Sequence, residues 1–266
     1  MPILAESFLL VSIGTRMKKH RFFISPEEFE KIHSNHDHTR VRVYPTILRQ
    51  WRDVLRLKAG DPIILLNGLG DEFHAEIAGY TKDEATFSKG ILKKNSNIPK
   101  VSVKLYSAML KKDKFEWVLQ KCTELGVSHF QPIISERTEK INLNFDRAEI
   151  IIREAAEQSE QGKLSVLSKT ISLEEALEDC KVNLSENNSD TETIYFALHM
   201  DGEKFETIQE KISTEKSVAI FIGPEGGWNE KDLEFFKTYN VPLISLGTSV
   251  LRGETASVAI SALLLL

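Results

Sequence analysis

Cysteine is scarce in this sequence. Cys122 and Cys180 are the only two among 266 residues, and they lie far apart in the chain. A disulfide-stapled domain and a Cys-based zinc site both need closely spaced cysteines, so the sequence excludes both kinds of protein. This composition is typical of a reducing compartment, and we expect a cytoplasmic protein that needs no metal.

Long apolar runs are also missing. No stretch approaches the roughly 18 apolar residues of a membrane-spanning helix, and the longest candidate, Ser257–Leu266, suits a short buried helix. The apolar patch Phe8–Val11 follows Glu6 rather than a basic residue, which makes it a poor secretory signal. We therefore expect no membrane partner.

An excess of basic over acidic residues is missing from most of the chain and occurs only near its start. The formal net charge is −5. Residues 16–58 carry eleven Lys and Arg against five Asp and Glu, whereas residues 59–266 carry 23 against 33. A basic N-terminal part in an otherwise acidic chain suits contact with phosphate groups. A solvated basic face without a ligand would give the same counts.

The chain is expected to form two domains after an N-terminal extension of residues 1–16. Residues 17–95 read as mostly β, with short strands at Pro62–Asn67, Glu72–Ile77 and Ala85–Phe87 separated by tight turns. Such strands favour a compact barrel. The polar segment 93–100 contains Asn, Ser and Pro, and we place a linker there.

Residues 101–266 alternate between strand and helix patterns. The expected helices are Lys112–Leu125, which Gly126 ends, then Arg147–Gln161, and one opened by Ser172 with Glu175 as a capping box. The expected strands are Val101–Ala108, His129–Ile134, Ile194–His199, Val218–Ile222 and Leu243–Leu246. This order predicts an α/β domain with a parallel sheet and helices on both faces.

Three strand ends carry the residues most suited to a ligand. They are residues 197–202, 222–228 and 245–256, and in a parallel sheet ligands bind beyond the carboxyl ends of the strands. Glycines in two of these loops allow the backbone to approach a ligand closely, although plain turns also use glycine. The segments contain neither a P-loop nor a dinucleotide fingerprint, because the spacing of both motifs is absent.

Arg252 stands at the junction between an apolar stretch and a helix of small and apolar residues. An arginine is rarely placed there unless it is paired or faces a ligand. An ion pair with Glu254 or Glu225 would also explain it. Glu225 itself could simply favour the start of a helix, and Trp228 is expected to pack rather than stack on a ligand.

The two late loops together resemble the signature of the SPOUT superfamily of methyltransferases, and in particular its RsmE family, the 16S rRNA uracil-N3 methyltransferases. The blocks IGPEGGW (222–228) and SLGTSVLRGETA (245–256) carry the resemblance. Further blocks in the same order are RFFISP, VLRLKAGD, KKDKFEWVLQKCTELGV, ISERT and EAAEQS, so the resemblance covers residues 17–266.

The resemblance implies a PUA-like RNA-binding barrel over residues 17–95 and a SPOUT domain with a C-terminal trefoil knot over residues 101–266. It implies a homodimer that binds S-adenosyl-L-methionine. The implied cofactor-binding residues are Leu198, His199, Gly202, Ile222, Gly223, Glu225, Gly226, Leu246, Gly247, Leu251 and Thr255. Basic residues expected to contact RNA phosphates are Arg40, Arg42, Arg56, Lys58, Lys111, Lys112, Lys114 and Arg137.

We expect catalytic roles for Arg252 and Glu254. Arg252 matches the arginine to which the family most often assigns a catalytic or orienting role. An arginine stays protonated and cannot take the uracil proton, so Glu254, Glu225 and water all remain candidate acceptors. Three positions depart from the family: Arg49-Gln50 stand where a His pair is usual, Lys163 replaces an Arg, and Gly253 replaces a Thr.

The expected function is S-adenosylmethionine-dependent methylation of N3 of a uridine in 16S rRNA, free or within the small ribosomal subunit. Two alternatives stay open. One is a non-catalytic RNA-binding or assembly protein on the same scaffold, which the intact GPEGG and LRGETA loops disfavour. The other is an RNA methyltransferase of the same superfamily that acts on another part of a nucleotide, such as the ribose.

Overall fold

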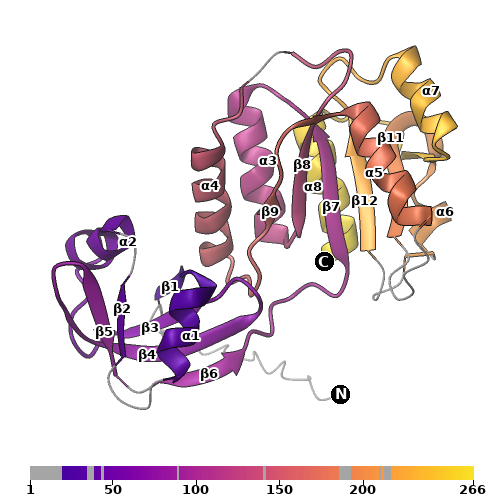
Figure 1. The fold of residues 1–266 in the computed structure, drawn as a ribbon. Coiled ribbons are helices and arrows are strands. Elements are labelled where there is room, and N and C mark those ends of the chain that lie inside the picture. The colour runs from indigo at the N-terminus through magenta and orange to yellow at the C-terminus, as the bar shows by residue number, and fades with distance from the viewer. Residues whose placement is uncertain are drawn as a thin grey trace, which may run out of the picture.

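The structure is a computed structural model that describes residues 20–34, 39–42, 45–88, 90–139, 142–185, 193–209, 211–212 and 217–266. These residues form two domains that lie side by side (Figure 1). The extension expected at residues 1–16 lies outside the described residues. The segment between the domains runs from Asn95 to Val101, slightly later than the expected linker, because Lys93 and Lys94 still belong to a strand.

The N-terminal domain is built on a six-stranded sheet in the order β1-β3-β4-β5-β2, with β6 also paired to β4. All its pairs are antiparallel except β1 with β3. The strands are β1 (His20–Phe23), β2 (Thr39–Arg42), β3 (Pro62–Leu66), β4 (Asp71–Tyr80), β5 (Glu84–Phe87) and β6 (Ile91–Lys94). The three strands expected from the sequence are therefore confirmed.

Helices in this domain were not expected, and their presence corrects the mostly β interpretation of its first half. They are α1 (Pro26–Ser34), α2 (Pro45–Arg49) and a π-helical turn over Gln50–Val54. The start of α1 has a clear sequence signal, since Ser25 Oγ accepts a hydrogen bond from Glu28 N at 3.2 Å and Pro26 occupies the first turn. The π-helical turn buries Trp51 completely between the rings of Phe22 and Phe87.

The second domain has a seven-stranded sheet in the order β10-β8-β7-β12-β11-β13, with β9 also paired to β8. Every pair in it is parallel, as expected. The strands are β7 (Ser102–Ala108), β8 (His129–Ile134), β9 (Val166–Leu167), β10 (Ile171–Ser172), β11 (Thr193–Lys204), β12 (Ser217–Ile222) and β13 (Leu243–Ser245). The trefoil knot stays a prediction.

Helices cover both faces of this sheet (Figure 1). They are α3 (Lys112–Leu125), α4 (Phe145–Gln158), α5 (Leu173–Ser185), α6 (Glu206–Gln209), α7 (Glu230–Thr238) and α8 (Gly253–Leu265). The capping box of α5 is present, because Ser172 Oγ and Glu175 Oε2 each accept a hydrogen bond from the other residue's backbone N. Gly126 ends α3 with φ of +100°.

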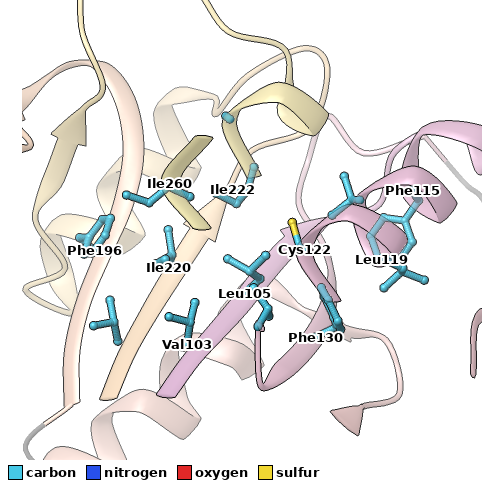
Figure 2. Close-up of a cluster of buried hydrophobic side chains, with 14 of the residues drawn as sticks. Val103, Leu105, Phe115, Leu119, Cys122, Phe130, Phe196, Ile220, Ile222 and Ile260 are labelled. Atoms are coloured by element: carbon cyan, nitrogen blue, oxygen red, sulfur yellow. The ribbon is translucent and has the colours of Figure 1, made fainter. Parts of the chain in front are cut away.

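Alternating residues of the central strands divide the core into two layers. Val103, Leu105 and Ile220 face α3 and α8, where they meet Cys122 and Ile260 (Figure 2). Their neighbours on the other face include Tyr106 and Phe221, whose rings stack with centroids 4.5 Å apart under α5 and α7. Both cysteines are free and buried. Burial of apolar residues on both faces is typical of a parallel sheet covered by helices.

Two side chains of α4 join the domains through hydrogen bonds to the main chain of Phe23. The Glu157 Oε1 atom on α4 accepts a hydrogen bond from Phe23 N at 3.0 Å, and Arg153 Nη1 donates to Phe23 O at 3.2 Å. The Phe23 ring packs with Ile64, Leu66 and Ala156 in a small apolar cluster that spans both domains. We call these contacts the domain seam.

A buried ion pair lies beside the seam. Arg21 Nη2 donates to Glu72 Oε2 at 2.6 Å, and Asn95 Nδ2 donates to the same oxygen at 3.0 Å. Burial raises the pKa of Glu72, but hydrogen bonds from His74 and Arg21 outweigh it and lower that pKa below its ordinary value. Glu72 is thus stabilised in its ionised form beside Asn95, the first residue of the segment that connects the two domains.

The seam makes stability depend on pH through Glu157. Burial raises the pKa of this carboxyl from 4.5 to about 7, although the Phe23 N–H and Arg153 oppose the shift. Between these values the native protein holds a proton that the unfolded chain releases, so unfolding free energy falls as pH rises. Glu157→Gln should therefore raise the urea midpoint at pH 8 relative to wild type and leave it nearly unchanged at pH 4.

The matched control is Glu149→Gln, which changes an exposed carboxyl on the same helix. Its urea midpoints should follow those of the wild type at every pH. Parallel curves for Glu157→Gln and wild type between pH 4 and 8 would show that the Glu157 carboxyl does not titrate in this window.

Candidate functional site

A cavity of about 470 Å³ opens at the bulge of β11 and beside the carboxyl ends of β12 and β13. Its walls come from residues 198–201, from the loop 222–228 and from segment 244–256. These are the three segments selected from the sequence, and the structure brings them together. The volume lies in the range of about 300–1,000 Å³ that small-molecule sites occupy.

Most of the expected cofactor-binding residues line this cavity. They are Leu198, His199, Ile222, Gly223, Gly226, Leu246, Gly247 and Leu251. Gly227, one of the loop glycines expected to approach a ligand, also lines the cavity. The lining further includes residues that the sequence did not single out as ligand contacts, namely Met200, Asp201, Pro224, Trp228, Ile244, Ser245, Ser249, Val250, Gly253 and Ala256. Glu225 and Thr255 do not line it, although their chain neighbours do.

Gly202 lies against the backbone of β13 rather than in the cavity wall. The strand β11 pairs with β13 at Ala197–Leu198 and again at Glu203, and the residues between bulge outward. A Cβ atom at Gly202 would stand 2.5 Å from Ile244 N, closer than real contacts allow. Gly202 therefore permits β11 and β13 to approach closely, and this contact shapes the cavity wall formed by residues 198–201.

Trp228 ties two walls together. Its Nε1 donates a hydrogen bond to Leu198 O at 3.1 Å, and its ring packs edge-on against Phe236 with centroids 4.9 Å apart. The side chain is 6% exposed, and a Cβ atom at Gly223 would meet its ring at 3.2 Å. The packing role expected for Trp228 is confirmed, and the same contacts make it part of the cavity floor.

Charged side chains gather beside the loop 222–228. Arg252 is exposed and has no ion pair within 4 Å among the described residues, although it lies near enough to Glu225 for the two charges to attract. Glu225 and Glu254 instead lie near Lys114, with Lys114 Nζ 2.5 Å from Glu225 Oε1 and 3.8 Å from Glu254 Oε1. The hydrogen bond that Lys114 donates to Glu225 lowers the pKa of Glu225. The same hydrogen bond raises the pKa of Lys114.

The residues expected to contact RNA fall into two groups. Arg56 and Lys58 are exposed on the N-terminal domain. Lys111, Lys114 and Arg137 lie on the second domain, where Arg137 Nη1 donates to Gly226 O at 2.9 Å and Lys111 stands 3.9 Å from Glu139. The side chains of Arg40, Arg42 and Lys112 lie outside the described ones.

Two further properties concern the described part of the chain. Within it, no three His, Cys, Asp or Glu side chains come close enough to hold a metal ion. Its helices are all too short or too polar to cross a bilayer.

Known protein families identify the class of this two-domain architecture. A family described as an RNA methyltransferase domain matches residues 97–265, and one described as an RNA methyltransferase PUA domain matches residues 52–89. The chain is therefore an RNA methyltransferase by family, with a PUA domain before the parallel sheet. The cavity lies in the domain that carries the methyltransferase match.

Individual relatives define the family further. The ribosomal RNA small subunit methyltransferase E of Rickettsia conorii is 31% identical over 78% of this chain and 81% of its own length. The protein of the same name from Bacillus subtilis is 28% identical over 77% of this chain and 81% of its own length. The chain belongs to the ribosomal RNA small subunit methyltransferase E family, which confirms the expected resemblance.

Solved structures agree on the fold. The ribosomal RNA small subunit methyltransferase E of Neisseria gonorrhoeae, solved bound to S-adenosyl methionine, superposes with a TM-score of 0.77 at 24% identity. The match covers 92% of this chain and 96% of that one. A probable rRNA methyltransferase from Porphyromonas gingivalis gives a TM-score of 0.73 at 23% identity over 91% and 95% of the two chains. Both domains thus share a known arrangement.

The close contact at Gly202 gives a test of the cavity wall. Gly202→Ala should lower the free energy of unfolding by roughly 1–3 kcal/mol, because the added methyl group meets backbone atoms of β13 that cannot move aside. Gly79→Ala is the matched control, since a methyl group added there would have nothing within 4 Å. Urea unfolding of both variants measures the difference. Equal midpoints would show that β11 and β13 tolerate a wider separation.

Proposed function

We propose that this protein transfers a methyl group from S-adenosyl-L-methionine to N3 of a uridine in small-subunit (16S) ribosomal RNA. The observation that carries the proposal is the single cavity formed by three loops at one sheet edge in a member of this family. The names of the relatives supply the substrate class.

The cavity fits the proposed cofactor in size and chemistry. Apolar side chains of Leu198, Ile222, Leu246 and Leu251 can cover an adenosine, while Gly223, Gly226 and Gly247 leave backbone groups accessible. Gly247 has φ of +132°, which side-chain-bearing residues rarely adopt. When bound, S-adenosylmethionine supplies an activated methyl group on a positively charged sulfur.

The residues around the cavity must bring an acceptor base to that methyl group. N3 of uracil is engaged in any Watson–Crick pair, so the target base has to be unpaired or turned outward. Arg252 is exposed, free of ion pairs among the described residues, and next to the lining residue Leu251. We assign it the role of holding the target nucleotide and stabilising negative charge on the uracil as N3 loses its proton.

The N-terminal domain suits the RNA partner. Exposed Arg56 and Lys58 can bind phosphates without reading sequence, which predicts affinity that falls with salt. A homodimer is supported by exposed apolar side chains on and before α8, including Val250 at 75% and Leu263 at 56% exposed. A cytoplasmic location follows from the ribosomal substrate proposed here.

Arg252→Ala tests the assigned role. It should slow methyl transfer roughly 100- to 1,000-fold, the usual cost of losing one donor to a developing anion, and leave cofactor binding nearly unchanged. Single-turnover methylation of RNA and calorimetry with S-adenosylmethionine measure the two effects. Lys237→Ala removes an exposed charge on α7 and serves as control. Full methylation by Arg252→Ala with unchanged affinities would make the assignment wrong.

Nucleoside mass spectrometry tests the proposed reaction. Ribosomal RNA from cells that lack this protein should have lost one 3-methyluridine, and the purified protein should restore it to that RNA with S-adenosylmethionine. Loss of a 2′-O-methyl nucleoside instead would indicate a ribose methyltransferase. An unchanged nucleoside profile together with no heat of cofactor binding would indicate a non-catalytic RNA-binding protein.

A further inference from the structure

Lys114 joins three segments that are distant in sequence. It lies in the first turn of α3, and its ammonium group contacts Glu225 of the loop 222–228 at 2.5 Å. The same nitrogen stands 3.8 Å from Glu254 in the first turn of α8. One cation therefore pairs with a carboxylate from the loop after β12 and with another from the start of α8, two segments that contribute residues to the cavity lining.

Glu254 needs this cation. Its side chain is 15% exposed, and its Oε2 atom is buried without a hydrogen-bond partner. A carboxylate withdrawn from water is costly unless an opposite charge or donors compensate it. The start of α8 contributes some compensation through its free N–H groups. Within the described chain, the ion pair of Glu254 is the one with Lys114.

The backbone around these carboxylates is closely packed. A Cβ atom at Gly253 would lie 3.1 Å from the Leu110 side chain and 3.2 Å from Gly223 O. The start of α8 thus touches both the chain before α3 and the loop after β12. Gly223 and Gly253 line the cavity, so a shift of either loop would change its shape.

We propose that Lys114 is a positioning residue of the methyl-transfer site, and that it fastens the loop 222–228 to the start of α8. Arg252 directly precedes Gly253, so this fastening also sets where its guanidinium group stands. The role in methyl transfer rests on the proposed function. It replaces the phosphate contact expected for Lys114, because two carboxylates already neutralise the ammonium charge that a phosphate would seek.

Hydrogen exchange tests the fastening without reference to activity. In Lys114→Met, backbone amides in residues 223–228 and 252–256 should exchange faster than in wild type, while amides of β7 and β12 stay protected. Lys114→Arg should restore slow exchange, since it keeps the charge. Unchanged exchange at both loops in Lys114→Met would overturn the proposal whatever the enzyme's activity.

Binding and rate measurements test the consequence for the reaction. Lys114→Met should slow single-turnover methylation roughly 10- to 100-fold by misplacing groups at the site, with RNA affinity and its salt dependence unchanged. The double variant Lys114→Glu with Glu225→Lys reverses that pair and should recover part of the rate. Lys58→Met is the comparison, because this exposed lysine lies on the first domain and is expected to change RNA affinity alone.

The opposite pattern would identify a phosphate contact. In that case Lys114→Met would weaken RNA binding, reduce the slope of log affinity against log salt by about one, and leave cofactor affinity and loop exchange as in wild type. That result would overturn the positioning role. If the wild-type protein methylates no uridine, the proposed function fails, whereas the exchange experiment still decides the fastening.

Discussion

The position of β11 between β12 and β13 is the constraint on which the site depends. Parallel pairing on both sides of one strand brings the ends of all three to the same edge of the sheet. The cavity follows from this pairing, because the segments that leave the three strands must lie next to one another at that edge. Gly202 allows the bulge of β11, and Trp228 ties that bulge to the next loop. The site is therefore built into the sheet rather than added to it.

The two layers of the core support this edge in different ways. Cys122 and Ile260 come from α3 and α8 and belong to the same apolar cluster as Val103, Leu105 and Ile220 of the central strands. That packing brings the starts of both helices beside the loop 222–228, where Lys114 and Glu254 meet. On the opposite face, the stacked rings of Tyr106 and Phe221 fix the sheet under α5 and α7. The positions of Lys114 and Glu254 beside the cavity thus depend on the apolar contacts that α3 and α8 make with the sheet.

Periodicity in the sequence predicted the second domain well. Helix α3 and strand β8 have the expected bounds, and the capping box at Ser172 and the turn at Gly126 were both readable from residue type. The first domain was harder, because α2 and the turn around Trp51 are short and mix polar with apolar residues. Ser25 and Pro26 are typical of a helix start and could have indicated α1, but the strand patterns on either side favoured a mostly β interpretation.

The candidate site was likewise predictable in part, because some of its features are local in the sequence and others arise only from the tertiary fold. Glycine loops after buried strands predicted which segments form the cavity, since strand ends are local features. The partners of charged side chains were not predictable, because Lys114, Glu225 and Glu254 are joined only by the tertiary fold. Gly202 illustrates the same limit, because its missing side chain allows close pairing of β11 with β13 and is not needed for direct contact with a ligand.

The domain seam has a consequence for how a nucleotide is chosen. Its hydrogen bonds involve the main chain of Phe23 and side chains of α4, so the first domain cannot swing without breaking them. For the RNA substrate proposed above, this rigid joint would keep nucleotides bound to the first domain at a fixed distance from the cavity. The target nucleotide would then be chosen mainly by its distance from the bound segment and by the shape of the RNA, with base-specific hydrogen bonds as a second contribution.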